Sequence, residues 1–214
     1  ASLTLEDGLF DEVGIEALAR GPLAATIQRL SLGRRGDRKL GPEAPRRLTG
    51  MPLLWELDLR GCAMSSATLV ALLDALPALR VLRLAECALG DEGLATLVAH
   101  PRFAELETLD LEANGLTAAA GAILARAPRL PLRLELNGNA LRDEGARAIA
   151  QAAAASRLTH LLLRDNGLGD EGALALVAET SHVRHVADLT LKGNAIGADA
   201  RQTLFNELGP RLID

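Results

Sequence analysis

A leucine frame that returns every 25 to 28 residues constrains the fold of this chain more than any other feature of the sequence. Its clearest copies read LRVLRLAECAL from Leu79, LETLDLEANGL from Leu106 and LTHLLLRDNGL from Leu158. The fourth position of the frame is leucine in eight copies: Leu3, Leu30, Leu57, Leu82, Leu109, Leu134, Leu161 and Leu189. Self-similarity at a fixed period of roughly 20 to 50 residues is typical of repeat architectures. We therefore expect a stack of similar units.

Each copy of the frame predicts a short strand followed by an inward polar residue. Paired leucines such as Leu109 and Leu111 alternate at period two, which gives a strand with one buried face. Three residues after the second leucine comes a small side chain: Cys62, Cys87, Asn114, Asn139, Asn166 or Asn194. Because such groups can satisfy the backbone where a strand ends, we expect this column to join each repeat to the next.

A helix is predicted after each strand. Apolar residues such as Leu94, Leu97 and Val98 fall on one helical face. The residues expected to cap these helices at their N-termini are Asp91, Asp143, Asp170 and Ser66. By the same spacing, Phe205 is expected in the core, and the terminal segment GPRLID is expected to fold over the last helix as a cap.

The pattern L-x-x-L-x-L-x-x-N/C-x-L, repeated from Leu3 to about Leu208, resembles the leucine-rich repeat in its ribonuclease-inhibitor-like subclass. The resemblance implies an α/β solenoid of about eight repeats, with a parallel sheet on the concave face and helices on the convex face. Strands stack about 4.8 Å apart and helices about 10 Å apart, so the helical side must be longer and the stack must curve. We expect a single domain over 1–214, either complete or excised from a longer chain.

Composition narrows the classes of function. The chain has 23 basic and 28 acidic residues and only 2% aromatics, which disfavours a nucleic-acid surface of either the duplex or the single-strand kind. No apolar run approaches the length of a membrane span, and no leader pattern opens the sequence. We expect a cytoplasmic monomer that binds neither nucleic acid nor membrane. The richness in Ala, Leu and Arg over Lys and Tyr favours a bacterial source with a GC-rich genome.

No set of residues predicts catalysis. Cys62 and Cys87 occupy the same slot in neighbouring units, where they can be either a reduced pair or a disulfide. His182 and His185 have the spacing of metal ligands but no Cys or carboxylate cluster beside them. The phrase DNGLGDEG from Asp165 has a calcium-like composition, although the turn and the helix start already account for its acids. We predict that the chain is not an enzyme and takes no cofactor or metal.

The second unit departs from the repeat. It carries GRRGDRK over Gly33–Lys39, with about three extra residues, where the other units continue directly into a helix. Arg34, Arg35, Arg38 and Lys39 make this the most basic stretch of the chain. A bulged loop is predicted, which is either simply solvated or a contact for phosphate or an acidic partner.

The predicted binding surface is the concave face, because residues flanking the strand leucines point away from the core. The residues singled out there as partner-binding are Trp55, Asp58, Arg60, Arg83, Asp110, Glu112, Glu135, Leu162 and Arg164. Both signs of charge alternate along this face, so the charged residues either bind a partner or pair with one another across strands. Leu162 is apolar where the repeat does not need it, and Trp55 is either an interface anchor or a cover for a neighbouring loop.

These features favour a protein-interaction scaffold that binds a protein partner on the concave sheet and adjoining loops. The resemblance leaves two alternatives. GTPase-activating proteins of the Ran system are built on similar repeats, and the arginines available for such a role are Arg34, Arg60, Arg142 and Arg164. The other alternative is an inhibitor of an enzyme, as in the family's namesake.

Overall fold

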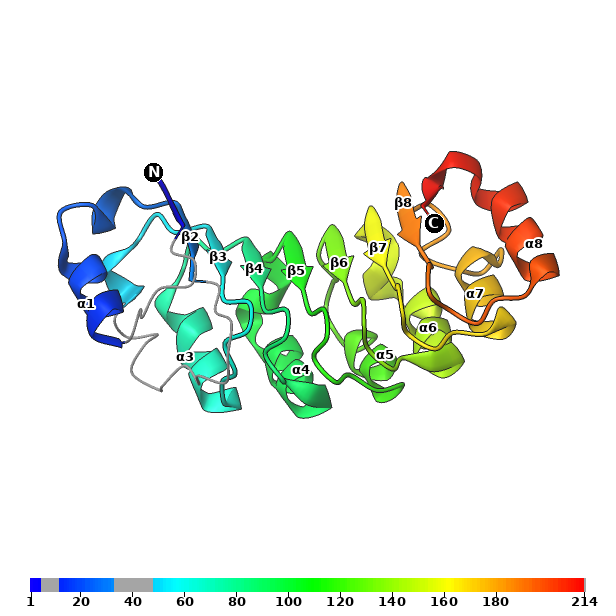
Figure 1. Cartoon of the computed structure of the whole chain (residues 1–214), viewed down its shortest axis with the longest axis horizontal. Helices are drawn as coiled ribbons and strands as arrows, with labels where there is room; N and C mark the ends of the chain where they lie inside the picture. Colours follow the sequence, from blue (N-terminus) through cyan, green and yellow to red (C-terminus); the bar gives the residue numbers. More distant parts are fainter. Residues whose placement is uncertain (5–11, 33–47, 214) are drawn as a thin grey trace.

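The chain forms one curved stack of repeats with a single parallel sheet along its inner side (Figure 1). The computed structural model describes residues 1–4, 12–32 and 48–213. The strands, in their order across the sheet, are β1 (Ser2–Thr4), β2 (Arg29–Ser31), β3 (Glu56–Asp58), β4 (Val81–Arg83), β5 (Thr108–Asp110), β6 (Arg133–Glu135), β7 (His160–Leu162), β8 (Asp188–Thr190) and β9 (Leu212–Ile213).

The register of the sheet follows the leucine frame. Leu30 pairs with Leu57, Leu57 with Leu82, and so on through Leu189, so the eight predicted strands and the α/β solenoid are confirmed. The terminal segment packs against the last helix, as the predicted cap does, and Arg211 Nη2 donates to Glu207 O of that helix at 2.8 Å. It forms a ninth strand, in which Leu212 pairs with Leu189. Sequence reasoning missed this strand because Gly209 stands where the frame has its first leucine.

Helices line the outer side of the arc (Figure 1). They are α1 (Glu12–Arg20), α3 (Ser66–Ala75), α4 (Gly90–Ala99), α5 (Ala119–Leu124), α6 (Arg142–Gln151), α7 (Asp170–Val177) and α8 (Ala198–Leu208). Short 3-10 turns lie in the connections: η1 (Ala24–Thr26), η2 (Leu48–Gly50), η3 (Pro101–Glu105), η4 (Ala153–Arg157) and η5 (Gly209–Arg211). The basic loop predicted over Gly33–Lys39 lies outside the described residues.

The core is a strip of leucine and alanine between sheet and helices. Leu94 and Leu97 on α4 are fully buried, and Phe103 fills the interior from η3. Phe205 was wrongly assigned to this core, because 61% of its surface is exposed, against 8% for Val98 at the equivalent position of α4. The reason is position along the stack: α5 packs against α4, the helix that carries Val98, whereas no α-helix of the described chain follows α8.

The asparagine column is confirmed as a ladder between repeats. Oδ1 of Asn139 accepts from the backbone N–H groups of Asn114 and Leu116, each at 3.0 Å, in the preceding repeat. Its Nδ2 donates to Leu111 O at 3.0 Å and Leu136 O at 2.9 Å. One buried side chain thus satisfies backbone groups on both sides of a repeat boundary, which fixes the stacking register.

The aspartates predicted to cap their own helices instead accept hydrogen bonds from backbone N–H groups of the following repeat. Asp143 lies in the first turn of α6, but its Oδ1 accepts from Gly169 N of the following repeat at 2.7 Å. Asp91 and Asp170 make the same contact with Thr117 N and Gly197 N. Glycine is needed for this approach, since a Cβ on Gly172 would lie 2.4 Å from Asp143 Oδ1. In the third unit the cap is Ser65, one residue before the predicted Ser66, and it accepts from Thr68 N at 3.1 Å.

Candidate partner-binding face

The strands β2 to β8 present a continuous concave face whose charged side chains are mostly held by one another. Of the predicted site residues, Arg60 and Arg164 are exposed, and Asp110 is buried. Those that lie half-buried on the sheet are Asp58, Arg83, Glu112, Glu135 and Leu162. The face is thus partly closed by its own ion pairs, as the cross-strand alternative predicted.

Glu56 on β3 organises the N-terminal part of this face. Its carboxylate, 8% exposed, forms ion pairs with Arg29 on β2 and Arg83 on β4. Burial acts to raise the pKa of Glu56, but hydrogen bonds and charges from the two arginines outweigh burial and lower it. Sequence reasoning placed Glu56 in an outward column without assigning it a role; its position between two arginines in adjacent strands was the available signal.

Trp55 lies beside this group, just before β3. The guanidinium carbon of Arg29 sits 5.5 Å from the centre of the Trp55 ring, a cation–π arrangement. The ring keeps 36% of its surface exposed, and Leu53 nearby in the same loop keeps 50%. Trp55 is therefore both a partial cover for its neighbour and an exposed aromatic surface.

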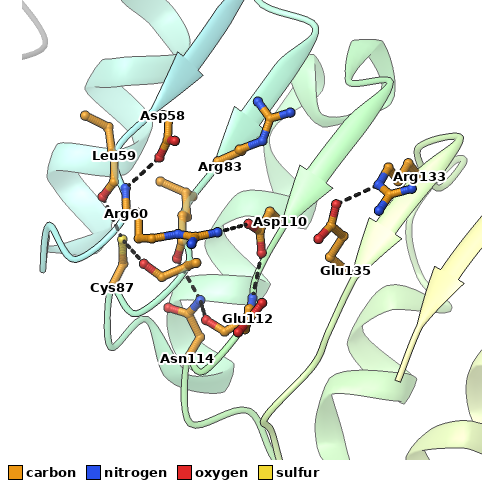
Figure 2. A network of polar contacts seen from close by, with 12 residues as sticks. Asp58, Leu59, Arg60, Arg83, Cys87, Asp110, Glu112, Asn114, Arg133 and Glu135 are labelled. Carbon is orange, nitrogen blue, oxygen red and sulfur yellow. Dashed lines mark hydrogen bonds and ion pairs between the residues drawn. The ribbon is translucent and has the colours of Figure 1, made fainter. Parts of the chain in front are cut away.

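A second group crosses the middle of the sheet (Figure 2). Arg60 Nη2 lies 3.4 Å from Asp110 Oδ2, although these residues belong to repeats on β3 and β5 with β4 between them. Ala85 is the β4 counterpart of Arg60 and is fully buried, so its small side chain leaves room for the arginine to pass above it. Asp110 Oδ1 also accepts from Glu112 N at 3.0 Å.

Asp110 is therefore misassigned as a surface contact. Only 1% of its surface is exposed, and burial raises the pKa of its carboxyl; Glu135 adds to the rise, whereas Glu112 N and Arg60 oppose it. Strand alternation correctly placed the side chain on the concave side. It could not predict burial, because burial depends on the path of Arg60.

The C-terminal half holds two further pairs. Arg133 Nε lies 2.6 Å from Glu135 Oε1, and His160 Nε2 lies 2.9 Å from Asp188 Oδ2. Thr159 Oγ1 donates to Leu132 O at 2.9 Å and lies 2.8 Å from His160 Nδ1. Because its hydroxyl proton is directed to a backbone carbonyl, Thr159 is a poor nucleophile in this arrangement.

Arg164 and Lys192 differ from the other concave cations. Both are exposed, and within residues 1–4, 12–32 and 48–213 neither side chain forms an ion pair or hydrogen bond. Leu162 lies half-buried on β7, in the same repeat as Arg164. Arg142, another cation considered for GTPase regulation, is exposed at the start of α6, while Arg34 lies outside the described residues.

Both cysteines are buried thiols, in agreement with the reduced alternative. Cys87 Sγ donates to Leu59 O at 3.2 Å, and burial raises the pKa of this thiol to about 12. Thiolate chemistry is therefore suppressed at neutral pH.

Metal ligands were considered around His182 and around Asp165. Within the described ranges, neither place nor any other brings together three His, Cys, Asp or Glu side chains that could hold a metal ion.

Comparison with known proteins agrees with this architecture. A model of the leucine-rich repeat family matches residues 76–98, 132–150 and 156–177. Ribonuclease inhibitor from Sus scrofa is 33% identical over 153 residues, which are 66% of this chain but only 33% of that protein. The chain thus matches about a third of the length of this curated relative. It belongs to the leucine-rich-repeat proteins and is of the ribonuclease-inhibitor-like kind.

Solved structures share the fold at low sequence identity. The leucine-rich-repeat-containing protein LegL7 from Legionella pneumophila superimposes with a TM-score of 0.67 at 19% identity, over 100% of this chain and 71% of that one. Human 5T4, also called trophoblast glycoprotein, gives a TM-score of 0.63 at 19% identity, over 99% and 74%. Among the helices of the described residues, none has the length and apolar character required to cross a bilayer.

Proposed function

We propose that this chain is a non-catalytic scaffold that binds a protein partner on the concave face of β3 to β8. The observation that carries the proposal is the arrangement of this face. Half-buried Val81 and Thr108 stand on the adjacent strands β4 and β5, and half-buried Leu162 stands on β7, among charged side chains already fixed in pairs. Such a surface offers apolar contact area and ordered polar groups to a partner.

Preorganisation supports binding in a second way. Arg60, Arg83 and Arg133 are long side chains that would lose rotamer freedom when a partner ordered them. Their ion pairs within the sheet hold them before a partner arrives. A partner therefore meets a surface whose ordering cost has largely been met by folding.

Inhibition of an enzyme is the second candidate. The name of the Sus scrofa relative and its 33% identity favour it. Regulation of a GTPase is less favoured, because Arg60 is engaged by Asp110; among the described arginines considered for that role, Arg142 and Arg164 are exposed without such a partner. The two buried thiols fit a reducing compartment, so we infer a cytoplasmic location.

The proposal is tested by affinity capture from native cells with three forms of the chain. The concave variant carries Val81→Lys and Thr108→Lys, both at half-buried sheet positions. The convex control carries Ala95→Lys and Ala122→Lys, at exposed positions of α4 and α5, and changes net charge equally. Circular dichroism verifies that all three forms fold.

We expect a protein that co-purifies with the wild type and the convex control to be lost from the concave variant. A partner retained by the concave variant and lost from the convex control would overturn the proposal. Recovery of the same partner at equal yield with all three forms would do so as well.

A further inference from the structure

The concave cations divide into two kinds. Arg29, Arg60, Arg83 and Arg133 each contact a carboxylate of the fold. Among the concave-face arginines and lysines that the structure describes, Arg164 and Lys192 lack such a contact. The arginines over β2 to β6 are thus each held by a carboxylate of the fold, whereas the cations that follow β7 and β8 are not.

These two cations are neighbours. Leu162 pairs with Thr190 in the sheet, so Arg164 and Lys192, each two residues further on, stand side by side at the ends of adjacent strands. The backbone remains paired around them, since Leu163 N donates to Thr190 O at 2.9 Å and Asp165 N donates to Lys192 O at 3.0 Å. Like charges opposite one another on adjacent strands repel, so this arrangement carries a cost that an anion would remove.

The acidic side chains near Arg164 and Lys192 contact other groups and form no ion pair with either cation in the described part of the chain. Asp188 contacts His160, and Glu135 contacts Arg133. The carboxylate of Asp165 packs against the turn, where a Cβ on Gly193 would lie 1.8 Å from its Oδ1. In the described part of the chain, Asp165 forms no ion pair with Arg164 or Lys192.

Asn137 extends the row by one strand. Its Oδ1 accepts from Arg164 N at 3.0 Å, which leaves the Nδ2 hydrogens as the polar group still available on this side chain. Asn137, Arg164 and Lys192 therefore line up on three successive repeats and offer N–H donors. Leu162 stands next to the row and provides an apolar contact.

We propose that Asn137, Arg164 and Lys192, with Leu162 beside them, form the subsite that receives an acidic, leucine-containing segment of the protein partner. Carboxylates suit this row because a guanidinium binds them through two parallel hydrogen bonds and an ammonium adds a mobile charge. This subsite rests on the proposed function. It specifies what the partner presents to the concave face, namely Asp or Glu side chains on either side of an apolar residue.

The test uses the whole chain and defined peptides. The probe is fluorescein-labelled Glu-Glu-Leu-Glu-Glu with blocked ends, compared with Lys-Lys-Leu-Lys-Lys and with a phosphoserine form of the acidic peptide. The test variant is Arg164→Glu with Lys192→Glu. The matched control is Arg126→Glu with Arg157→Glu, which makes the same charge change at exposed sites away from the sheet strands.

A site-specific probe locates binding. The sequence has two lysines, Lys39 and Lys192, so reductive methylation with ¹³C formaldehyde gives few signals and keeps the positive charge. A Lys192→Arg variant assigns the Lys192 signal. We expect the acidic peptide to shift that signal.

In anisotropy titrations at low salt, we expect the acidic peptide to bind about tenfold more weakly to the test variant and within about twofold of wild type to the control. Equal loss in both variants would overturn the subsite, as would an unshifted Lys192 signal or equal binding of the basic peptide. Binding of the phosphoserine peptide alone would overturn the assignment to carboxylates.

Failure of the subsite and failure of the scaffold can be told apart. If the native partner is lost from the Val81→Lys, Thr108→Lys variant but retained by the Arg164→Glu, Lys192→Glu variant, the concave scaffold stands and the acidic subsite falls. Loss from both of these variants, with retention by the Arg126→Glu, Arg157→Glu control, supports both.

Discussion

Arg60 Nη2 lies 3.4 Å from Asp110 Oδ2 across an intervening strand of the concave sheet (Figure 2). Asp110 is almost completely buried, whereas the Arg60 side chain keeps half of its surface exposed. The arginine thus supplies a partly solvated cation to a carboxylate that has lost its water. This contact ties the third repeat to the fifth.

Removal of this arginine should destabilise the fold. Arg60→Ala leaves Asp110 without its cation, and we expect a loss of about 1 to 2 kcal/mol in the free energy of unfolding. Urea denaturation measures it. The control is Arg147→Ala, which breaks the exposed pair with Glu171 and should cost less than about 0.5 kcal/mol. Equal costs would contradict the special position of Arg60.

Asp110 and Glu56 should give opposite pH dependences. The pKa of Asp110 is raised, so the folded state binds its proton more readily than the unfolded state does. The stability advantage of the wild type over Asp110→Asn should therefore grow from about pH 7 to about pH 4. Unfolding free energies of both proteins across this range measure the change.

The pKa of Glu56 is lowered, and the sign reverses. The stability contributed by its ionised form is present above the unfolded pKa and is lost as the pH falls through the folded value, so the advantage over Glu56→Gln should shrink below about pH 4.5. Parallel pH profiles for the two variants would contradict the assignment of these shifts.

The leucine frame was sufficient to predict β1 to β8, the curvature and the asparagine ladder, because each depends on spacing along the chain. Side-chain targets were harder. Asp143 fits a helix cap by spacing, yet its bond partner is Gly169 in the next repeat. Strand alternation predicts that Asp110 faces the concave side like its counterparts on the other strands, yet Asp110 is buried and paired with Arg60, which lies two strands away. Such contacts depend on stacked units and side-chain paths that a linear pattern does not contain.

The ladder predicts a large cost for the loss of an inward amide. Asn166→Ala leaves Leu136 O and Arg164 O without the Nδ2 donor that contacts each of them at 2.9 Å. The same change removes Oδ1, the acceptor for the buried N–H of Leu141 at 3.4 Å. We expect a loss of about 2 to 4 kcal/mol in unfolding free energy, because each of the two carbonyls loses one of its donors and the Leu141 N–H loses its acceptor. Asn206→Ala, an exposed change on α8, serves as the control. A similar small effect in both would refute the ladder.

The buried thiols should be inert in the native state. Cys62 and Cys87 are both inaccessible, and the pKa of Cys87 is raised to about 12, so little thiolate forms at neutral pH. Ellman's reagent should label neither cysteine before unfolding and both afterwards. Absence of titratable thiols in unfolded, unreduced protein would indicate a disulfide instead.

Photo-cross-linking in native cells tests whether a protein partner is held on the concave face. Benzoylphenylalanine is placed singly at Thr108 or Leu162 on the sheet, and at Ala95 or Ala122 on the outer helices. We expect one partner, identified by mass spectrometry, in adducts from the sheet positions, and we expect that partner to be absent from adducts at the helix positions. Adducts of that partner from Ala95 and Ala122, with none from Thr108 and Leu162, would contradict this expectation.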